Sequence, residues 1–369
     1  MSNIKIHANY PGANIKVGEI TDNTIMLEQE IRDTTEWWFY WNFCVESPPE
    51  GEFVFEFTNG NVVGPWGPSA SFDRVNWDWL GSGMCKTTNT FKYVFKGSEK
   101  HVYFSMSLPY QLEDFERFFL KYQTHPMVRR DILTTSEQGR LIPLLRIGEG
   151  TKHVFFIARS HACESVSNYL LEGLMEYIIG VGDDLLADYC FHVIPFMDID
   201  GVENGDQGKS RHPHDHNRDY TDKPIYNANA ALMDYGSKFK PVCFIDFHCP
   251  WIWHEGDVRD KYPFFVKMPS PMKERIEKLS IILRETTLEN NNNDRIVYDS
   301  KYDIESGVEW NKPELMPGSS TEFFDKIGSN LVLTVEMPYF GSENCMFTQK
   351  NTRIFGLDFG RALKKYFKE

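Results

Sequence analysis

Hydrophobic and polar positions follow different patterns in the two halves of the chain. Between about residues 36 and 108 the apolar segments are short, aromatic and often alternating, and Gly, Pro, Asn or Ser bounds each of them. This pattern is typical of antiparallel strands joined by tight turns, and it predicts a β-sandwich. The segment at residues 94–104, VFKGSEKHVYF, predicts a hairpin with its loop at residues 97–100.

Three tryptophans, Trp66, Trp77 and Trp79, lie among glycines and prolines between these predicted strands. Exposed tryptophans can form a platform for a sugar or a peptide, whereas packing into a core is the commoner fate of this side chain. Both interpretations stay open at the level of the sequence.

Longer apolar runs alternate with helical segments in the second half. The runs include HVFFIA, DYCFHVIPFMDIDG, PVCFIDFHC and SNLVLTVEMPYFG, and a helical period follows the first of them from Val166 to Ile178. Further helices are expected near residues 272–287 and in the tail. The alternation predicts an α/β domain with a mixed sheet at residues 126–369, preceded by the antiparallel β-sandwich domain at residues 1–125. The turn-rich stretch 124–139 marks the boundary, and the insertion between residue 290 and Ser320 is either a lid or a surface loop.

The composition describes a folded globular protein. The chain has 369 residues, 41% of them hydrophobic, and a formal net charge of -14. Because no long run of Lys and Arg occurs, neither nucleic acid nor an anionic membrane is expected as a partner. Seven scattered cysteines without a CxxC motif, and a polar start without a signal core, favour a reducing cytoplasmic location.

Residues capable of chemistry stand at or just after the ends of the apolar runs. They are His161 with Glu164, Asp198 with Asp200, His248, and Glu336. A sheet brings the carboxyl ends of its parallel strands to one edge, so these groups can converge. Two imidazoles and a carboxylate suit a catalytic zinc that keeps one position for water, and Glu336 could then accept a proton from that water. An HxxE pair alone is weak evidence, and a strand-end histidine is often a hydrogen-bonded core residue.

The motifs together carry a resemblance. HACE, then DIDGVENGDQGKSRHPHDHNRDY, then DFHC, then LTVEMP resemble the zinc metallocarboxypeptidase family in kind, order and context. In the first half, WWFYW, YFSMSLPYQLEDF, LIPLL and the ARSH motif are similar to the cytosolic carboxypeptidase branch, which has an N-terminal β domain. The resemblance implies an α/β/α carboxypeptidase fold and one zinc ion per chain.

Site residues follow from the resemblance, position by position. It implies that His161, Glu164 and His248 bind zinc and that Glu336 is the general base. Asp215 matches the carboxylate that orients the first histidine, and Asn217 with Arg218 match the pair that holds the substrate's terminal carboxylate. The neighbouring His212, His214 and His216 match no ligand of the family, although a second metal in that polar loop is an alternative.

Three features depart from the family. Gly208 occupies the place of an arginine that polarises the scissile carbonyl, and Lys209 or Arg211 could take over that role. No tyrosine occurs between Tyr302 and Tyr339, where the family's catalytic tyrosine is expected. The segment PGSSTEFF replaces a basic patch associated with the choice of glutamate side chains, so a strict deglutamylase is not expected.

The sequence therefore predicts a zinc-dependent metallocarboxypeptidase that hydrolyses the C-terminal bond of peptides or protein tails. Two alternatives stay open. One is a related zinc amidohydrolase acting on N-acyl amino acids or cell-wall peptides, and the other is a zinc-holding pseudoenzyme that binds a partner. The favoured terminal residue, the physiological substrate and the oligomeric state are not determined by the sequence.

Overall fold

Two five-stranded sheets form the N-terminal part of the chain. The computed structural model describes residues 4–32, 34, 37–180, 183–252, 259–289, 295–315 and 317–369. One sheet has the order β1 (Lys5–His7), β4 (Asn42–Glu46), β10 (His101–Ser105), β6 (Ser69–Ser71), β7 (Asp78–Trp79). The other has the order β2 (Lys16–Thr21), β3 (Thr24–Glu28), β5 (Gly51–Phe57), β9 (Thr90–Phe95), β8 (Cys85–Thr87). All pairs are antiparallel except β3 with β5, which is parallel.

Aromatic side chains fill the space between these two sheets. In β5 every second residue is buried, and the Phe55 ring lies 5.7 Å from Phe43 and 5.6 Å from Phe104, centroid to centroid, both of which belong to the other sheet. Offset and tilted ring pairs at such distances stabilise a core beyond the area they bury. The predicted β-sandwich is confirmed, and its core explains the aromatic alternation.

The predicted hairpin at residues 97–100 is wrong. β9 belongs to one sheet and β10 to the other, so the two strands do not pair with each other. Gly97, with φ of 74°, lets the chain cross between the sheets, and Phe95 and Phe104 then face one core from opposite sides with their centroids 6.3 Å apart. Alternation marks the buried face of a strand but does not say which strand is its neighbour.

The three tryptophans pack rather than form a platform. Trp77 is 6% exposed. Trp66 and Trp79 are half-buried, and their indole N–H groups donate to the carbonyl oxygens of Phe340 and Phe347 at 3.1 and 2.6 Å. These bonds join the N-terminal sheets to the last third of the chain.

A seven-stranded mixed sheet forms the rest of the molecule. Its order is β11 (Val128–Thr135), β12 (Leu141–Ile147), β14 (Tyr189–Ile194), β13 (Lys152–Ala158), β15 (Cys243–His248), β17 (Leu331–Glu336), β16 (Phe264–Val266). The four central strands, β14, β13, β15 and β17, are parallel to one another, and the others are antiparallel to their neighbours. A short pair, β18 (Gly341–Ser342) and β19 (Cys345–Met346), follows.

The mixed α/β fold is confirmed, with one correction at its start. The turn-rich stretch 124–139 contains β11, whose largely exposed side chains at the sheet edge explain its low apolar content. The helix α1 (Leu112–Tyr122) separates β11 from the N-terminal sheets. The division at residue 125 remains a prediction.

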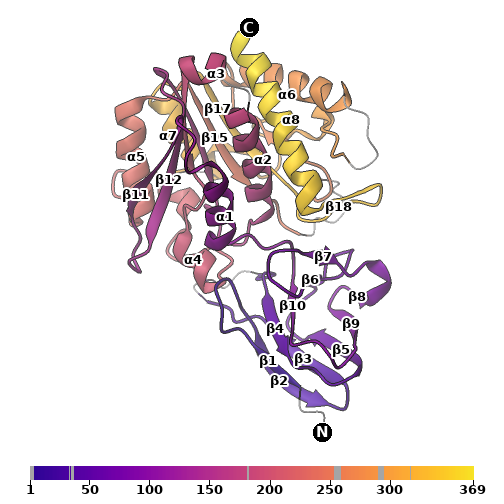
Figure 1. Ribbon diagram of the computed structural model, residues 1–369. Coiled ribbons are helices and arrows are strands. Elements are labelled where there is room, and N and C mark those ends of the chain that lie inside the picture. The colour runs from indigo at the N-terminus through magenta and orange to yellow at the C-terminus, as the bar shows by residue number, and fades with distance from the viewer. Residues whose placement is uncertain are drawn as a thin grey trace.

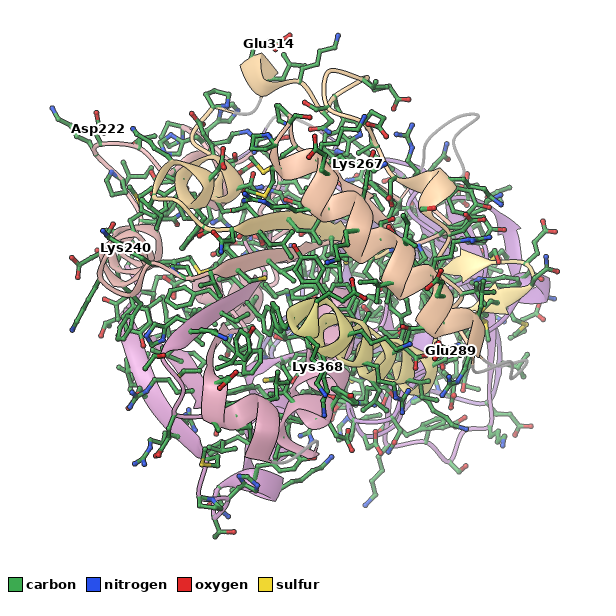
Figure 2. The ribbon with its side chains drawn as sticks, turned by 90° about the horizontal axis from the view of Figure 1, so that it is seen from above. Asp222, Lys240, Lys267, Glu289, Glu314 and Lys368 are labelled. Atoms are coloured by element: carbon green, nitrogen blue, oxygen red, sulfur yellow. The ribbon has the colours of Figure 1, made fainter. Side chains whose placement is uncertain are left out.

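Helices cover both faces of this sheet (Figure 1). α5 (Asn227–Phe239) and α7 (Ser320–Lys326) lie on one face, and α2 (Val166–Gly180), α6 (Met272–Glu289) and α8 (Gln349–Lys368) lie on the other. The short helices are α3 (Asp183–Asp188) and α4 (Ile199–Asn204), with 3-10 turns η1 (Ser82–Met84), η2 (His216–Arg218), η3 (Ser300–Tyr302) and η4 (Pro313–Leu315). From above, α6 and α8 run side by side, and labelled charged residues such as Asp222 and Glu314 lie at the rim (Figure 2).

Close packing of α2 against α8 depends on two glycines. A Cβ atom at Gly173 would lie 1.9 Å from the Arg353 carbonyl oxygen, and one at Gly356 would lie 2.0 Å from that of Leu170. Any side chain at either position would force the helices apart. The insertion predicted as a lid or loop contains η3 and η4, and its asparagine-rich part, residues 290–294, lies outside the described residues.

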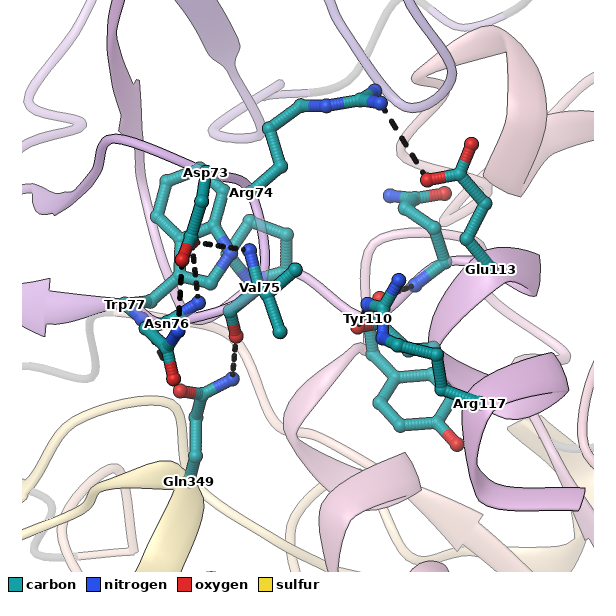
Figure 3. A network of polar contacts seen from close by, with 12 residues as sticks. Asp73, Arg74, Val75, Asn76, Trp77, Tyr110, Glu113, Arg117 and Gln349 are labelled. Atoms are coloured by element: carbon teal, nitrogen blue, oxygen red, sulfur yellow. Dashed lines mark hydrogen bonds and ion pairs between the residues drawn. The ribbon is translucent and has the colours of Figure 1, made fainter. Parts of the chain in front are cut away.

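The N-terminal sheets are tied to the α/β part by side-chain hydrogen bonds (Figure 3). Asp73 accepts from the backbone N–H groups of Val75 and Asn76, each at 2.8 Å, which shapes the loop. Gln349, at the start of α8, accepts from the Trp77 N–H at 3.1 Å and donates to the Val75 carbonyl at 2.9 Å. One glutamine side chain therefore holds this loop against the second half of the chain.

Candidate metal and catalytic site

The candidate residues lie at the carboxyl ends of three neighbouring parallel strands and in the turns that follow them. β13 ends at Ala158, and the turn that follows it carries His161 and Glu164 before α2 begins. His248 is the last residue of β15 and lies in register with Glu336, the last residue of β17. The carboxyl edge of the sheet thus brings together side chains that are far apart in the sequence.

Glu164 is the centre of this group. Its Oε1 atom lies 2.9 Å from His161 Nδ1, and its Oε2 atom lies 2.8 Å from His248 Nδ1. One donor atom from each of the three side chains falls within 4.8 Å of the others, and Glu164 is fully buried. Burial would raise the pKa of Glu164, but Lys209 and the two histidines hold it well below its usual range. The group is therefore an ionised carboxylate.

Each histidine has a second carboxylate on its other ring nitrogen. His161 Nε2 lies 3.4 Å from Asp215 Oδ2, and His248 Nε2 lies 3.0 Å from Asp246 Oδ2. Such outer carboxylates fix the tautomer of a ligating histidine and leave the inner nitrogen's lone pair toward the metal. The donor set of His161, Glu164 and His248 fits a zinc ion on these grounds.

Asp246 is a candidate that the sequence reasoning missed. It precedes His248 by two residues on β15, so the alternation of a strand places both side chains on one face. That spacing is the signal that could have identified it. Ser320 also donates a hydrogen bond from its hydroxyl to Asp246 Oδ2 at 2.5 Å, which holds the carboxylate in place.

Lys209 reaches the candidate metal ligands, whereas Arg211 does not. The Lys209 ammonium group contacts Glu164 Oε1 and donates to the Cys249 carbonyl oxygen at 2.9 Å. Arg211 is instead paired with Asp198 at 2.9 Å and with Asp206 at 3.3 Å. Of the two candidates for the carbonyl-polarising role, the geometry therefore favours Lys209.

Gly208 has a steric reason to be glycine. Its φ is 80°, and a Cβ atom there would lie 2.5 Å from the Ala162 nitrogen and 3.1 Å from the His161 Cα atom. An arginine at this position would collide with the backbone of the HACE turn. The close approach of these two segments thus excludes the family's residue at 208 and presents the next side chain, Lys209, to the site.

A cavity of about 400 Å³ opens beside these groups. It is lined by His161, Lys209, Arg218, Pro250, Trp251, Arg259, Phe264, Trp310, Leu315 and Glu336. Three of these side chains are cationic, and no tyrosine is among the lining residues that the structure describes. The sequence reasoning did not find Trp251, Arg259 or Trp310, because they lie in loops between His248 and Glu336 whose shape no periodic pattern encodes.

Glu336 has the properties of a proton acceptor. It is buried, and its Oε2 atom has no hydrogen-bond partner within the described part of the chain. Burial, and then repulsion from Glu164, raises the pKa of Glu336 to about 7, although His248 and Lys209 act in the opposite direction. A carboxyl group with a pKa near the working pH is suited to taking up and releasing a proton.

Asn217 and Arg218 belong to η2, and Arg218 lines the same cavity. Asp215 begins this turn and accepts from the Asn217 N–H at 2.9 Å. The Asn217 side chain is buried, with its Nδ2 atom 3.4 Å from His248 Nε2 and its Oδ1 atom accepting from the Ser320 N–H at 3.2 Å. Arg218 lines the cavity and bonds the Asn217 carbonyl oxygen at 2.8 Å.

The remaining candidate residues make their contacts outside the cavity. Asp198 caps α4, and Asp200 accepts from the Ser136 hydroxyl and the Gln138 N–H at 2.8 and 3.0 Å, so the second apolar run contributes no cavity-lining carboxylate. In the polar loop, His214 pairs with Asp219 at 2.7 Å, and the His216 ring stacks on Tyr226. Tyr339 is buried, with its hydroxyl 3.3 Å from Cys163 Sγ.

The N-terminal sheets also support a wall of the cavity. Trp37 stacks on Trp251 with their ring centroids 5.9 Å apart and their planes at 14°. Gln207 accepts from the backbone N–H groups of Phe39 and Tyr40 at 2.7 and 3.2 Å, and its own carbonyl oxygen accepts from the Cys163 N–H at 3.0 Å. The segment FYW of the first half therefore contacts the loop that carries Lys209.

The grouped His, Glu and His residues form a donor set that fits catalytic zinc. A family model described as zinc carboxypeptidase matches residues 120–242. This stretch of the chain is therefore similar to a zinc carboxypeptidase domain. No helix in the described part of the chain combines the length and the apolar character that a membrane span requires.

Two relatives named as cytosolic carboxypeptidases also match part of the chain. The chain is 28% identical to cytosolic carboxypeptidase 6 of Caenorhabditis elegans over 43% of its own length and 39% of that protein's. It is 25% identical to cytosolic carboxypeptidase 1 of Mus musculus over 45% of its own length, but only 16% of that protein's. The chain thus spans less than half the length of either relative.

Two bacterial structures share the fold over nearly the whole chain. A metallo-carboxypeptidase from Burkholderia cenocepacia superimposes with a TM-score of 0.80 at 19% identity, covering 99% of both chains. One from Pseudomonas aeruginosa, in complex with (2-guanidinoethylmercapto)succinic acid, gives a TM-score of 0.78 at 20% identity over 99% of both chains. The N-terminal sheets and the α/β part together are therefore a recurring arrangement.

Proposed function

We propose that this protein is a zinc-dependent metallocarboxypeptidase that removes the last residue of a peptide or of a protein tail. The observation that carries the proposal is the convergence of His161, Glu164 and His248. Their donor atoms lie within 4.8 Å of one another, and both outer histidine nitrogens face carboxylates. Three protein ligands with room for a water molecule are typical of catalytic zinc sites.

Zinc in such a site lowers the pKa of a water molecule toward about 7 and polarises a carbonyl group. Glu336 accepts the proton of the attacking water and later passes it to the leaving amine. Its burial, its pKa of about 7 and the absence of a partner for its Oε2 atom among the described residues support this role. Lys209 would stabilise the negative charge that develops on the carbonyl oxygen.

Exopeptidase action would come from the carboxylate-binding pair. Arg218 lines the cavity, and its planar guanidinium group is suited to bidentate contact with a terminal carboxylate. Asn217 lies behind it and is held by Ser320 and by its contact with His248. No disulfide joins the cysteines in the described part of the chain, in keeping with action in a reducing compartment.

Mass spectrometry of a mixed peptide pool tests the proposal. The purified protein should produce ladders of peptides shortened from their C-termini, and these should be missing with a chelator and with the Glu336→Gln variant. Restoring activity by adding zinc to the chelated sample would separate loss of metal from loss of fold. Intact peptides in the presence of a zinc-loaded, folded protein would contradict the proposal and favour acylated amino acids or cell-wall fragments as substrates.

A further inference from the structure

A second group of metal-binding residue types lies at the opposite end of the same sheet. His153 is the second residue of β13, and Cys190 and His192 are on β14. His153 and Cys190 are paired in register in these parallel strands, and His192 follows Cys190 by two residues. All three side chains therefore point to one face of the sheet. The aromatic ring of Phe239, on α5, packs on this face. Its centroid lies 4.7 Å from that of His153 and 5.1 Å from that of His192.

The three donor atoms are already close together. One atom from each side chain lies within 4.8 Å of the other two, and His153 Nδ1 is 2.9 Å from His192 Nε2. Cys190 and His192 are buried, whereas His153 is half-buried and gives access from the surface. Tetrahedral zinc with bonds of about 2.0 Å to nitrogen separates two ligating nitrogens by about 3.3 Å. The imidazole rings of His153 and His192 would therefore have to move apart only slightly to bind the same ion.

Tyr235 supplies an outer partner. Its hydroxyl oxygen lies 2.8 Å from His192 Nδ1. In the tautomer in which His192 Nδ1–H donates to this hydroxyl group, the lone pair of Nε2 faces His153. Fixing the tautomer of a ligating histidine in this way is the usual task of a residue behind a metal ligand.

We propose that His153, Cys190 and His192 form a second metal site, for a borderline or soft ion such as zinc or copper(I). Thiolate and imidazole ligands together select such ions rather than magnesium or calcium. Binding would form bonds to His153 Nδ1, His192 Nε2 and Cys190 Sγ. The Cys190 thiol would release its proton to solvent, and no electron transfer is involved.

Cobalt(II) loading of the full-length protein tests this site alone. Cobalt bound to a thiolate has an intense charge-transfer absorption in the near ultraviolet, and the candidate ligands of the first site include no cysteine. Wild-type protein should bind two equivalents of cobalt and show this band. Cys190→Ser should bind one equivalent without the band. Cys85→Ser, a change of a half-buried cysteine in the N-terminal sheets, should behave as the wild type.

His153→Gln provides a second test should the buried Cys190 position not tolerate serine. This half-buried variant should need at least ten-fold more cobalt to reach half of the band. Saturating cobalt without the band in the wild type would overturn the proposal, as would a band that persists in folded Cys190→Ser. Neither readout depends on peptidase activity, so failure of this site and failure of the proposed function can be told apart.

Discussion

The two ends of the central sheet place histidines in opposite electrostatic environments. At the carboxyl end, burial would lower the pKa of His248, but Asp246 and Glu164 raise it well above the usual value. At the amino end, His192 faces His153 and Tyr235, and its pKa falls to about 3. Both rings are buried in the same sheet, so the neighbouring carboxylates decide the difference. Carboxylates and cations therefore surround the histidines at the carboxyl end, whereas a thiol and a second imidazole lie beside His192 at the amino end.

The largest expected effect at the carboxyl end is the loss of the proton acceptor. Glu336→Gln should reduce kcat by about 10²–10⁴-fold, the usual contribution of general acid–base catalysis. Zinc content, measured by elemental analysis, should not change, because Glu336 is not among the three candidate ligands. Glu343→Gln, at an exposed glutamate a few residues further on, is the matched control and should keep full activity. Near-normal turnover of Glu336→Gln would mean that another residue is the base.

Loss of the buried ammonium group should have the next largest effect. Lys209→Ala should lower kcat by about 10²–10³-fold with a smaller change in KM, as removal of an oxyanion partner does. The exposed Lys223→Ala serves as the control for the loss of one positive charge. If Lys209→Ala changes zinc affinity but not kcat in zinc-saturated protein, the lysine only positions Glu164.

Neutralising an outer carboxylate should weaken the first metal site selectively. Asp246→Asn should reduce zinc affinity by about 10–100-fold, because the asparagine no longer balances the charge on His248. Competition with a chromogenic chelator measures this change. Asp234→Asn, at an exposed position on α5, should not alter it. In Asp246→Asn the thiolate-to-cobalt band of the second site should remain, which would show that the two ends are independent.

The smallest expected effect concerns acid stability in metal-free protein. Because the folded-state pKa of His192 is depressed to about 3 from 6.5, the unfolded chain binds more protons between these values. The contribution of His192 to stability is complete above about pH 6.5 and falls by at most about 1.4 kcal/mol per pH unit as the pH drops toward 3. Urea unfolding at pH 7 and pH 5 should show a smaller loss in His192→Gln than in wild type. His101→Gln, at an exposed histidine, should lose as much as the wild type.

Local sequence patterns were sufficient to predict a helix or strand wherever one of its faces is buried against a single layer of the fold. The apolar runs that became β13, β15 and β17, and the helical period of α2, lie where they were expected. The strand β11 and the crossing at Gly97 were missed, because an edge strand needs little apolar surface and alternation does not name the partner strand. Asp246 was within reach of the sequence, since it shares a face with His248, but the cavity residues Trp251 and Arg259 were not.

The sequence by itself determined the kind of element in most of the chain and the chemical types of residue at the strand ends, because hydrophobic period and strand-end placement are local properties. Tertiary structure alone decided which of those residues meet. In the folded chain Asp198 caps a helix and pairs with Arg211. Asp246 contacts the outer nitrogen of His248, and Lys209 rather than Arg211 contacts Glu164. The physical reason is that such meetings depend on packing between distant segments, as when the backbone of the HACE turn leaves room at position 208 for glycine alone.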